Sequence, residues 1–229
     1  MVGIIGAMHI EVETIKSIME NKTAETISGV EYVKGTLHGK EIVIAVCGIG
    51  KVAAAMCAQT MILKYSPGCI INTGVGGSLS TALAIGDIAV AESLVQHDMD
   101  TSPLGDPIGL ISGINIVNIP ADNGVVKLLC EGIETLEKVK GMRGIIASGD
   151  QFIASEEKKK FIVANFGAIV CEMEGASIAQ VCFTNGVPFG VVRAVSDCAD
   201  GSSHMDYGEF LPVAAANAAK LIEYFVKNR

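Results

Sequence analysis

The sequence predicts an α/β fold in which helices flank a central mixed, twisted β-sheet, and it predicts one domain over residues 1–229. Three observations support this. Short β-rich apolar runs alternate with helical patterns from end to end of the chain, as in sheets covered on both faces. The 229 residues are 50% hydrophobic and no linker divides them, so the chain can bury one large core. Residues 23–46 alternate polar and apolar side chains, which indicates antiparallel strands within the sheet.

The expected strands are short apolar runs that end at polar or glycine-rich positions. In chain order they are VGIIG (2–6), EIVIAVCG (41–48), GCIINTG (68–74), DIAVAESLVQHD (87–98), RGIIASGD (143–150), AIVCEM (168–173) and PFGVVRAVSD (188–197). Directly before the second of these, the tripeptide HGK (38–40) lies between two alternating runs, which predicts a hairpin.

Helical patterns fill most of the intervals between these runs. They cover approximately residues 9–21, 51–65, 123–139, 156–166, 174–185 and 207–227. The fourth is preceded by Ser155, a good N-cap, and places two acids in its first turn and lysines after them, as the helix dipole favours. Residues 98–121 form a long connection with three prolines, and loops of this length in compact domains are often functional.

Composition excludes several classes of partner. The formal net charge is -8 and the basic residues are scattered, so neither a nucleic acid nor an anionic membrane is expected to bind. The uncharged stretch 65–86 is interrupted by Pro67 and several glycines, which favours a buried strand leading into a glycine loop over a membrane span. The N-terminus lacks a basic region followed by an apolar one, so we expect a cytoplasmic protein that binds a small molecule.

Polar side chains follow almost every expected strand. Because ligands bind at the carboxyl ends of strands in open α/β sheets, these positions predict one polar pocket. The residues concerned are Glu11, the glycine loop 74–78, His97, Asp98, Asp100, Asp150, Glu172, Glu174, Ser196 and Asp197.

Three carboxylates in this set each allow two interpretations. Glu174 lies where a strand changes to a helix, so its two oxygens could bind a pair of vicinal hydroxyls, or it could only stabilise the first turn of its helix. Glu11, taken alone, is typical of a surface helix residue. Asp197 ends a buried strand, where an acid is either part of a site or the N-cap of a helix.

Other motifs are excluded by their spacing. GIGK (48–51) lacks the first glycine and the Ser/Thr of a phosphate-binding loop, and GIIGAM (3–8) lacks the spacing of a dinucleotide fingerprint. His9 with Glu13, or HDMD at 97–100, would need a further metal ligand that the sequence does not offer nearby. We therefore expect neither a metal nor a cofactor.

With these residues in hand, the chain resembles the bacterial 5'-methylthioadenosine/S-adenosylhomocysteine nucleosidases of the purine nucleoside phosphorylase superfamily. The resemblance covers essentially the whole chain. It rests on eight motifs in the order and spacing of the family: GIIGAMHIEVE, GIGKVAAA, INTGVGGSL, GDIAVAESLVQHDMD, ASGDQFI, EMEGASIA, VVRAVSD and GEFL. It implies a nucleoside phosphorylase-like fold and hydrolysis of an adenine N-glycosidic bond.

The resemblance also implies a role for each site residue. Asp197 would donate a proton to adenine N7, which requires its carboxyl to carry or share that proton, and Ser196 would position it. Glu174 would hold the ribose hydroxyls above Met173. Glu11 would activate the attacking water, with Arg193 nearby. The remaining substrate contacts would come from Met8, Ile49, Val75, Gly76, Leu104 and Tyr207, with Phe152 stacking on adenine and the Ile153 backbone at the base edge.

Some positions depart from the family pattern and leave the preferred 5' substituent open. Val75 stands where many members have a small polar residue, and LGDPIG, with Leu104 and Asp106, replaces a more aromatic FGYEYG. Tyr207 stands where phenylalanine is common. The form QHDMD…LGDPIG resembles members that also cleave 6-amino-6-deoxyfutalosine, so this nucleoside and 5'-deoxyadenosine are further candidate substrates.

Two alternatives to the nucleosidase stay open at the level of sequence. A phosphorylase would need arginines around a phosphate, whereas only Lys51 is basic near GIGK and nothing basic lies near GVGGS. A non-catalytic nucleoside sensor would be expected to lack Glu11, Glu174 or Asp197. The resemblance further implies a homodimer in which the neighbouring subunit's segment near residues 105–115 closes the 5' pocket.

Overall fold

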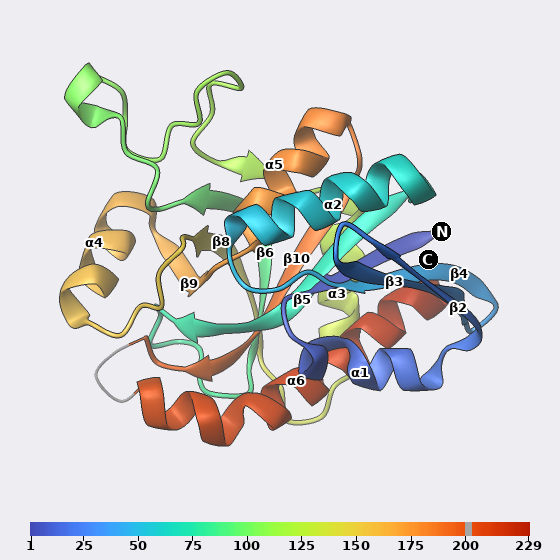
Figure 1. The fold of residues 1–229 in the computed structure, drawn as a ribbon. Coiled ribbons are helices and arrows are strands. Elements are labelled where there is room, and N and C mark those ends of the chain that lie inside the picture. Colours follow the sequence, from blue (N-terminus) through green and yellow to red (C-terminus); the bar gives the residue numbers. More distant parts are fainter. Residues whose placement is uncertain (200–202) are drawn as a thin grey trace.

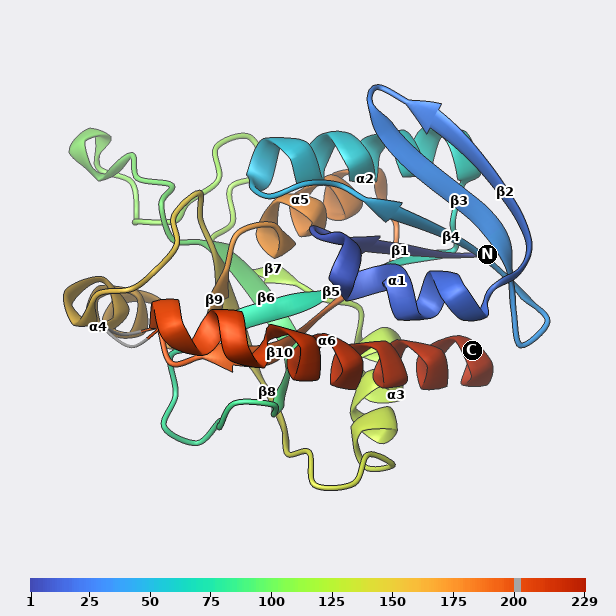
Figure 2. The ribbon, with the colours of Figure 1, turned by 60° about the horizontal axis from the view of Figure 1, so that its bottom comes forward.

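The computed structural model describes residues 1–199 and 203–229, and of residues 203–207 it describes the backbone only. The predicted fold class is confirmed, because one mixed, twisted sheet carries helices on both faces (Figures 1 and 2). The helices are α1 (His9–Ile18), α2 (Lys51–Tyr65), α3 (Asn123–Ile133), α4 (Glu156–Phe166), α5 (Gly175–Asn185) and α6 (Ser203–Asn228), with a short 3-10 turn at Ser102–Leu104.

The strands of the described chain join into a single sheet. They are β1 (Val2–Gly6), β2 (Glu20–Ile27), β3 (Val30–Leu37), β4 (Lys40–Val46), β5 (Cys69–Ser78), β6 (Ile88–Gln96), β7 (Ile119–Pro120), β8 (Gly141–Ser148), β9 (Ala168–Glu172) and β10 (Phe189–Asp197). All seven expected runs form strands, and the HGK tripeptide forms the β3–β4 hairpin, in which His38 and Gly39 both adopt positive φ.

Part of the sheet closes on itself. β5 pairs with β10, β10 with β6, β6 with β8, β8 with β9, and β9 pairs again with β5. β1 extends from the other half of β5, and β4, β3 and β2 continue outward from it. The closed half therefore brings the carboxyl ends of β5, β9 and β10 together, which strand prediction alone does not imply.

The structure corrects several expected boundaries. The glycine stretch 74–78 is not a loop but the second half of β5, because it pairs with β10 and β9. α1 ends at Ile18 because the chain turns into β2, a strand that pairs with β3 and makes the antiparallel part three-stranded. α3 ends at Ile133, after which the chain turns and Lys138 adopts a positive φ.

The helices form two layers around the sheet. α2 and α5 pack together over one face, and α1, α3 and α6 cover the other (Figures 1 and 2). Five of the seven cysteines are buried among apolar side chains, as expected for small hydrophobes. Within the described ranges, no helix is both long and apolar enough to cross a membrane.

Candidate active site

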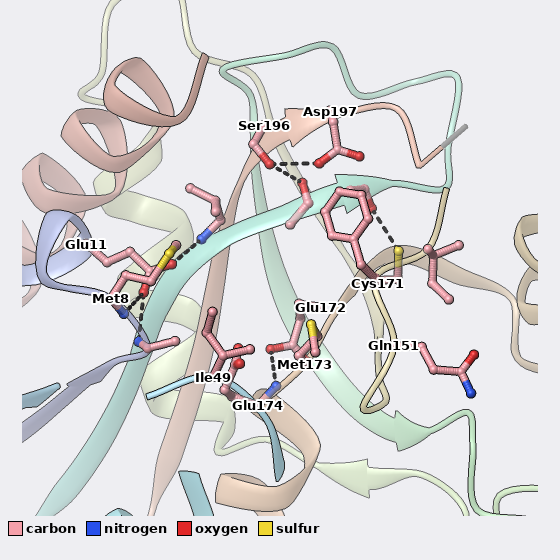
Figure 3. Close-up of a pocket in the computed structure, with 16 residues that line it drawn as sticks. Met8, Glu11, Ile49, Gln151, Cys171, Glu172, Met173, Glu174, Ser196 and Asp197 are labelled. Carbon is pink, nitrogen blue, oxygen red and sulfur yellow. Dashed lines mark hydrogen bonds between the residues drawn. The ribbon is translucent and has the colours of Figure 1, made fainter. Parts of the chain in front are cut away.

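A cavity of about 390 Å³ opens at the carboxyl ends of the strands, a volume typical of small-ligand sites. Figure 3 shows the side chains that surround it. The lining residues come from the ends of β1, β4, β5, β8, β9 and β10: Ala7, Met8, Glu11, Ile49, Val75, Gly76, Gly77, Gln151, Phe152, Ile153, Cys171, Glu172, Met173, Glu174, Ser196 and Asp197. The predicted convergence of strand ends on one pocket is therefore present.

Glu11 projects from the first turn of α1 into this cavity and is buried, not on the surface as its position alone suggested. Its Oε2 accepts hydrogen bonds from the amides of Ala7 (2.7 Å) and Met8 (2.9 Å), and its Oε1 accepts one from Val75 N (3.1 Å). Three of roughly four acceptor positions are thus used, which leaves one for a ligand or water. Burial raises the pKa of Glu11 despite these amides and the nearby Arg193.

Glu174 lies between β9 and α5, at the predicted change from strand to helix. It is the N-cap residue by position, yet its side chain makes no capping hydrogen bond and instead accepts from Gly50 N at 2.8 Å. Burial and the neighbouring charge of Glu172 raise the pKa of Glu174 to about 7, although Arg193 opposes the shift. The Glu174 side chain therefore makes its hydrogen bond to the residue before α2 and not to the first turn of α5.

Glu172 performs the helix-capping task instead. Its Oε2 accepts hydrogen bonds from the amides of Glu174 (3.1 Å) and Gly175 (2.7 Å) at the start of α5. Its Oε1 accepts from the Ser148 hydroxyl, whose oxygen in turn accepts from Ala176 N at 2.7 Å. Glu172 therefore fixes the first turn of α5, and with it the backbone that carries Glu174.

Arg193 is the cation that compensates this carboxylate cluster. Its side chain is 1% exposed and forms an ion pair with Glu172, and Nη2 lies 3.7 Å from Glu174 Oε2. Nη2 also donates to Asn72 Oδ1 at 2.5 Å, whereas the buried Nε has no partner among the described residues. Although burial disfavours its charged form, the carboxylates of Glu172, Glu174 and Glu11 raise the pKa of Arg193.

Asp197 ends β10 on another side of the cavity. Its Oδ2 accepts from the Ser196 hydroxyl at 2.9 Å and its Oδ1 from Ala199 N at 2.9 Å, so both oxygens are oriented by short contacts. The helix that follows, α6, begins only at Ser203, so Asp197 is not the N-cap of a helix. Asp197 lines the cavity together with Ser196 (Figure 3).

The rest of the lining is largely apolar. Phe152 and Ile49 are exposed by 50% and 60%, and Met8 and Met173 add further apolar side chains to the lining. No Lys, Arg or His belongs to the lining described here. Residues 1–199 and 208–229 also contain no group of three or more His, Cys, Asp or Glu side chains placed to hold a metal ion.

Comparison with known proteins identifies the family. A family model for the phosphorylase superfamily matches residues 1–227. The 5'-methylthioadenosine/S-adenosylhomocysteine nucleosidase of Shewanella sp. (strain W3-18-1) is 40% identical over 222 residues, which cover 96% of both chains. The chain belongs to this nucleosidase family.

Solved structures of nucleosidases agree with this assignment. The Neisseria meningitidis 5'-methylthioadenosine/S-adenosylhomocysteine nucleosidase in complex with methylthio-immucillin-A has a TM-score of 0.97 at 35% identity, covering 100% of this chain and 99% of that one. A futalosine hydrolase of Helicobacter pylori (strain 26695) has a TM-score of 0.95 at 37% identity, covering 100% and 97%. The expected nucleoside phosphorylase-like fold and the expected enzyme class, an N-glycosidic hydrolase, are confirmed with the family.

Most residues that the nucleosidase resemblance singled out meet in the cavity. These are Met8, Glu11, Ile49, Val75, Gly76, Phe152, Ile153, Met173, Glu174, Ser196 and Asp197. Of the other three, Arg193 and Leu104 do not line it, and Tyr207 cannot be placed by its side chain. Arg193 lies behind Glu172 and Glu174, Leu104 is 83% exposed on the long connection, and the side chain of Tyr207 lies outside the described residues.

Some lining residues of this nucleosidase were not predicted from the sequence. Gln151 and Cys171 each lie one place in the chain from a residue that the sequence did assign to the pocket, Phe152 and Glu172. Asp98, Asp100, Asp150 and His97, all grouped with the pocket by sequence, do not line it. The strand-end rule places a residue at the correct edge of the sheet, but the direction of each side chain depends on local backbone geometry.

Proposed function

We propose that this cavity hydrolyses the adenine N-glycosidic bond of 5'-methylthioadenosine and S-adenosylhomocysteine, releasing adenine and the 5-substituted ribose. The observation that carries the proposal is the convergence of Glu11, Glu174 and Asp197, from three separate elements, on one largely apolar cavity. A flat aromatic base suits the apolar lining, and each carboxylate can serve a different part of a nucleoside.

Asp197 acts on the leaving base. As the bond between C1' and N9 breaks, its electron pair passes to adenine, and a proton given by Asp197 to N7 makes the base a better leaving group. The Ser196 hydroxyl and Ala199 amide, each 2.9 Å from one carboxylate oxygen, hold the side chain in place for this transfer. Phe152 stacks on the adenine ring and the Ile153 backbone contacts its edge.

Glu174 binds the two ribose hydroxyls, with Met173 beneath the sugar. Its Oε1 is held by Gly50 N, so the carboxylate is oriented before the substrate arrives. Its negative charge also favours the ribosyl cation that develops as the bond breaks. Arg193 touches neither sugar nor base in this arrangement and is a positioning residue, which holds Glu172 by an ion pair and favours the charged form of Glu174.

Glu11 orients and deprotonates the attacking water. The oxygen of this water forms the new bond to C1', and its proton passes to the Glu11 carboxylate. Burial raises the pKa of Glu11, which makes the carboxylate a stronger base than an exposed glutamate. Val75 contributes its backbone amide to Glu11 but offers no side-chain hydroxyl to the water.

Water is favoured over phosphate as the nucleophile by the charge of the cavity. The lining contains Glu11, Glu172, Glu174 and Asp197, and the guanidinium behind it is already paired with Glu172. A phosphate dianion placed here would meet carboxylates without a free cation to compensate it. The phosphorylase alternative is disfavoured on this ground.

The 5' group is accommodated at the open side of the cavity, near Met8 and Ile49. Leu104, Asp106 and Tyr207 stay predictions as contacts to this group, as does a homodimer in which the partner's segment near residues 105–115 closes the pocket. The structural similarity to a futalosine hydrolase supports 6-amino-6-deoxyfutalosine as a further substrate. A cytoplasmic location also stays a prediction.

An incubation with candidate nucleosides tests the proposal. The purified protein is mixed with methylthioadenosine, S-adenosylhomocysteine, 5'-deoxyadenosine and aminodeoxyfutalosine, with and without phosphate, and the adenine and sugar products are followed. Adenine with free sugar in phosphate-free buffer is the expected result. Sugar 1-phosphate formed only with phosphate would show a phosphorylase, and no product from any nucleoside would favour a sensor.

A further inference from the structure

A second polar cluster lies beside the active site and takes no part in the chemistry proposed above. Lys51, the first residue of α2, donates from Nζ to Asp98 Oδ1 at 2.6 Å and to Gln96 Oε1 at 3.1 Å. The Lys51 and Asp98 side chains are 19% and 16% exposed, so the pair is largely shielded from water. Such a pair is more sensitive to loss of one partner than a surface ion pair is.

Asp150 connects this ion pair to two backbone segments. Its amide donates to Asp98 Oδ2 at 2.9 Å, and its own Oδ1 accepts from Lys51 N at 2.8 Å. Asp150 follows β8, Asp98 follows β6, and Lys51 begins α2. The three residues therefore join three elements through a closed ring of contacts. Although burial opposes it, the contacts with Lys51 and the Asp150 amide hold the pKa of Asp98 below its usual range.

Both neighbours of this ring belong to the active site. Gly50, directly before Lys51, donates its amide to Glu174 Oε1 at 2.8 Å. The segment 151–153, directly after Asp150, carries Phe152 and Ile153 into the cavity. α2 has no acid in its own first turn, so its two leading amides are taken by carboxylates from distant parts of the chain, Glu174 and Asp150.

We propose that Lys51, Asp98 and Asp150 form a positioning unit that holds the start of α2 against Glu174 and at the same time holds the base-binding segment 151–153. The inference rests on the proposed function, because it assigns to this unit the placement of the ribose-binding and adenine-binding groups. Gly50 adopts a φ of +98°, and a Cβ there would lie 3.0 Å from Asp150 Oδ1, so the turn that presents this amide to Glu174 favours glycine.

The positioning unit also affects the pKa of Glu174, which a contact with a merely structural role would not do. The charged and titratable groups facing Glu174 are Glu172 from β9, Arg193 from β10, Glu11 from α1 and the Cys47 thiol after β4. Among the contacts that favour its ionised form, the Gly50 amide is the one that depends on the start of α2. When that amide moves away, the pKa of Glu174 rises, and the ionised carboxylate is lost at a higher pH than before.

Two variants and a control test the positioning unit. Lys51→Met removes the ammonium, and Asp150→Ala removes the carboxylate at an exposed residue whose loss leaves no buried charge. Lys64→Met makes the same charge change at the other end of α2, where Lys64 pairs with Glu25 on the surface. Thermal unfolding checks that each variant is folded, and kcat, KM and the pH profile of kcat/KM are measured with methylthioadenosine.

Both variants are expected to lower kcat/KM by roughly tenfold or more, and to move the acidic limb of the profile upward by about one pH unit. Lys64→Met should match the wild type. Folded variants with wild-type profiles would overturn the inference while leaving the proposed function intact. If Lys51→Met does not fold, the result for Asp150→Ala alone decides whether the positioning unit exists. A wild type that releases no adenine would refute the proposed function and this inference with it.

Discussion

Replacing Gly74 with alanine should test the role of Glu11 without altering the glutamate itself. Gly74 lies in the middle of β5, and a Cβ at this position would lie 2.6 Å from Glu11 Oε1 and 3.1 Å from its Cδ. An ordinary contact begins near 3.4 Å, so the carboxylate must retreat by 3.4 minus 2.6, about 0.8 Å. It cannot do so freely, because the amides of Ala7, Met8 and Val75 hold it.

The expected size of the effect follows from this displacement. The hydrogen bond from Val75 N is already 3.1 Å long, and a further retreat of Oε1 would stretch or break it. A misplacement of about 1 Å in a reacting group can lower turnover by about 10²-fold, equivalent to about 2.7 kcal/mol in the barrier. Overpacking should also lower the free energy of unfolding by about 1–3 kcal/mol.

The assay compares adenine release with ligand binding. Gly74→Ala should lower kcat by about 10²-fold, while a 5'-thio-substituted inhibitor, measured by calorimetry, should bind with near-normal affinity. Gly190→Ala is the matched control, because its Cβ would lie 2.5 Å from Val125 Cγ1, also within paired strands but in the core away from the cavity. It should lower the melting temperature and leave kcat unchanged.

Two results would refute this reasoning. If folded Gly74→Ala kept a kcat within a few-fold of the wild type, the position of Glu11 would not matter for the reaction. If it lost inhibitor affinity and kept its kcat, Glu11 would serve binding and not the activation of water.

Three further predictions concern the other charged residues. Asp197→Asn should lower kcat by about 10²–10⁴-fold and still bind adenine, and strong residual turnover would contradict the N7-acid role. Because an ionised Glu174 is needed and its pKa is raised to about 7, kcat/KM should fall as the pH drops below about 7, and a profile flat to pH 5 would exclude this dependence. Glu172→Gln should cost about 3 kcal/mol of unfolding free energy, because it leaves Arg193 short of its principal partner. The melting temperature measured by calorimetry should then fall by roughly 6–12 °C. An unchanged melting temperature would show that the fold does not depend on the Glu172–Arg193 pair.

The position of Glu174 shows how far local sequence patterns extend. The run AIVCEM followed by small helix-forming residues predicted a strand that ends just before a helix, and β9 and α5 meet at Glu174 as expected. The same pattern did not decide which of the two glutamates caps the helix. That choice depends on Ser148 and Gly50, which lie 28 and 124 residues from the groups they contact.

The burial of Glu11 could not be predicted from local sequence patterns. One glutamate in the first turn of an amphipathic helix is ordinarily a surface residue, and only its position after the first strand and the resemblance to a family indicated a site. Its burial arises because β1 pairs with β5, so that Gly74 and Val75 lie against the start of α1. Strand pairing of this kind joins segments more than 60 residues apart, and no local periodicity contains it.

The sequence by itself determined the α/β class, the expected strands, the hairpin at His38–Gly39 and the family, because these depend on local propensity, periodicity and motif spacing. Only the tertiary structure decided that β9 and β10 both pair with β5, that Arg193 lies behind the carboxylates, and that Lys51 joins Asp98. The physical reason is that these features are set by which strand edges meet and which charges must be paired once buried, and both are properties of the folded chain.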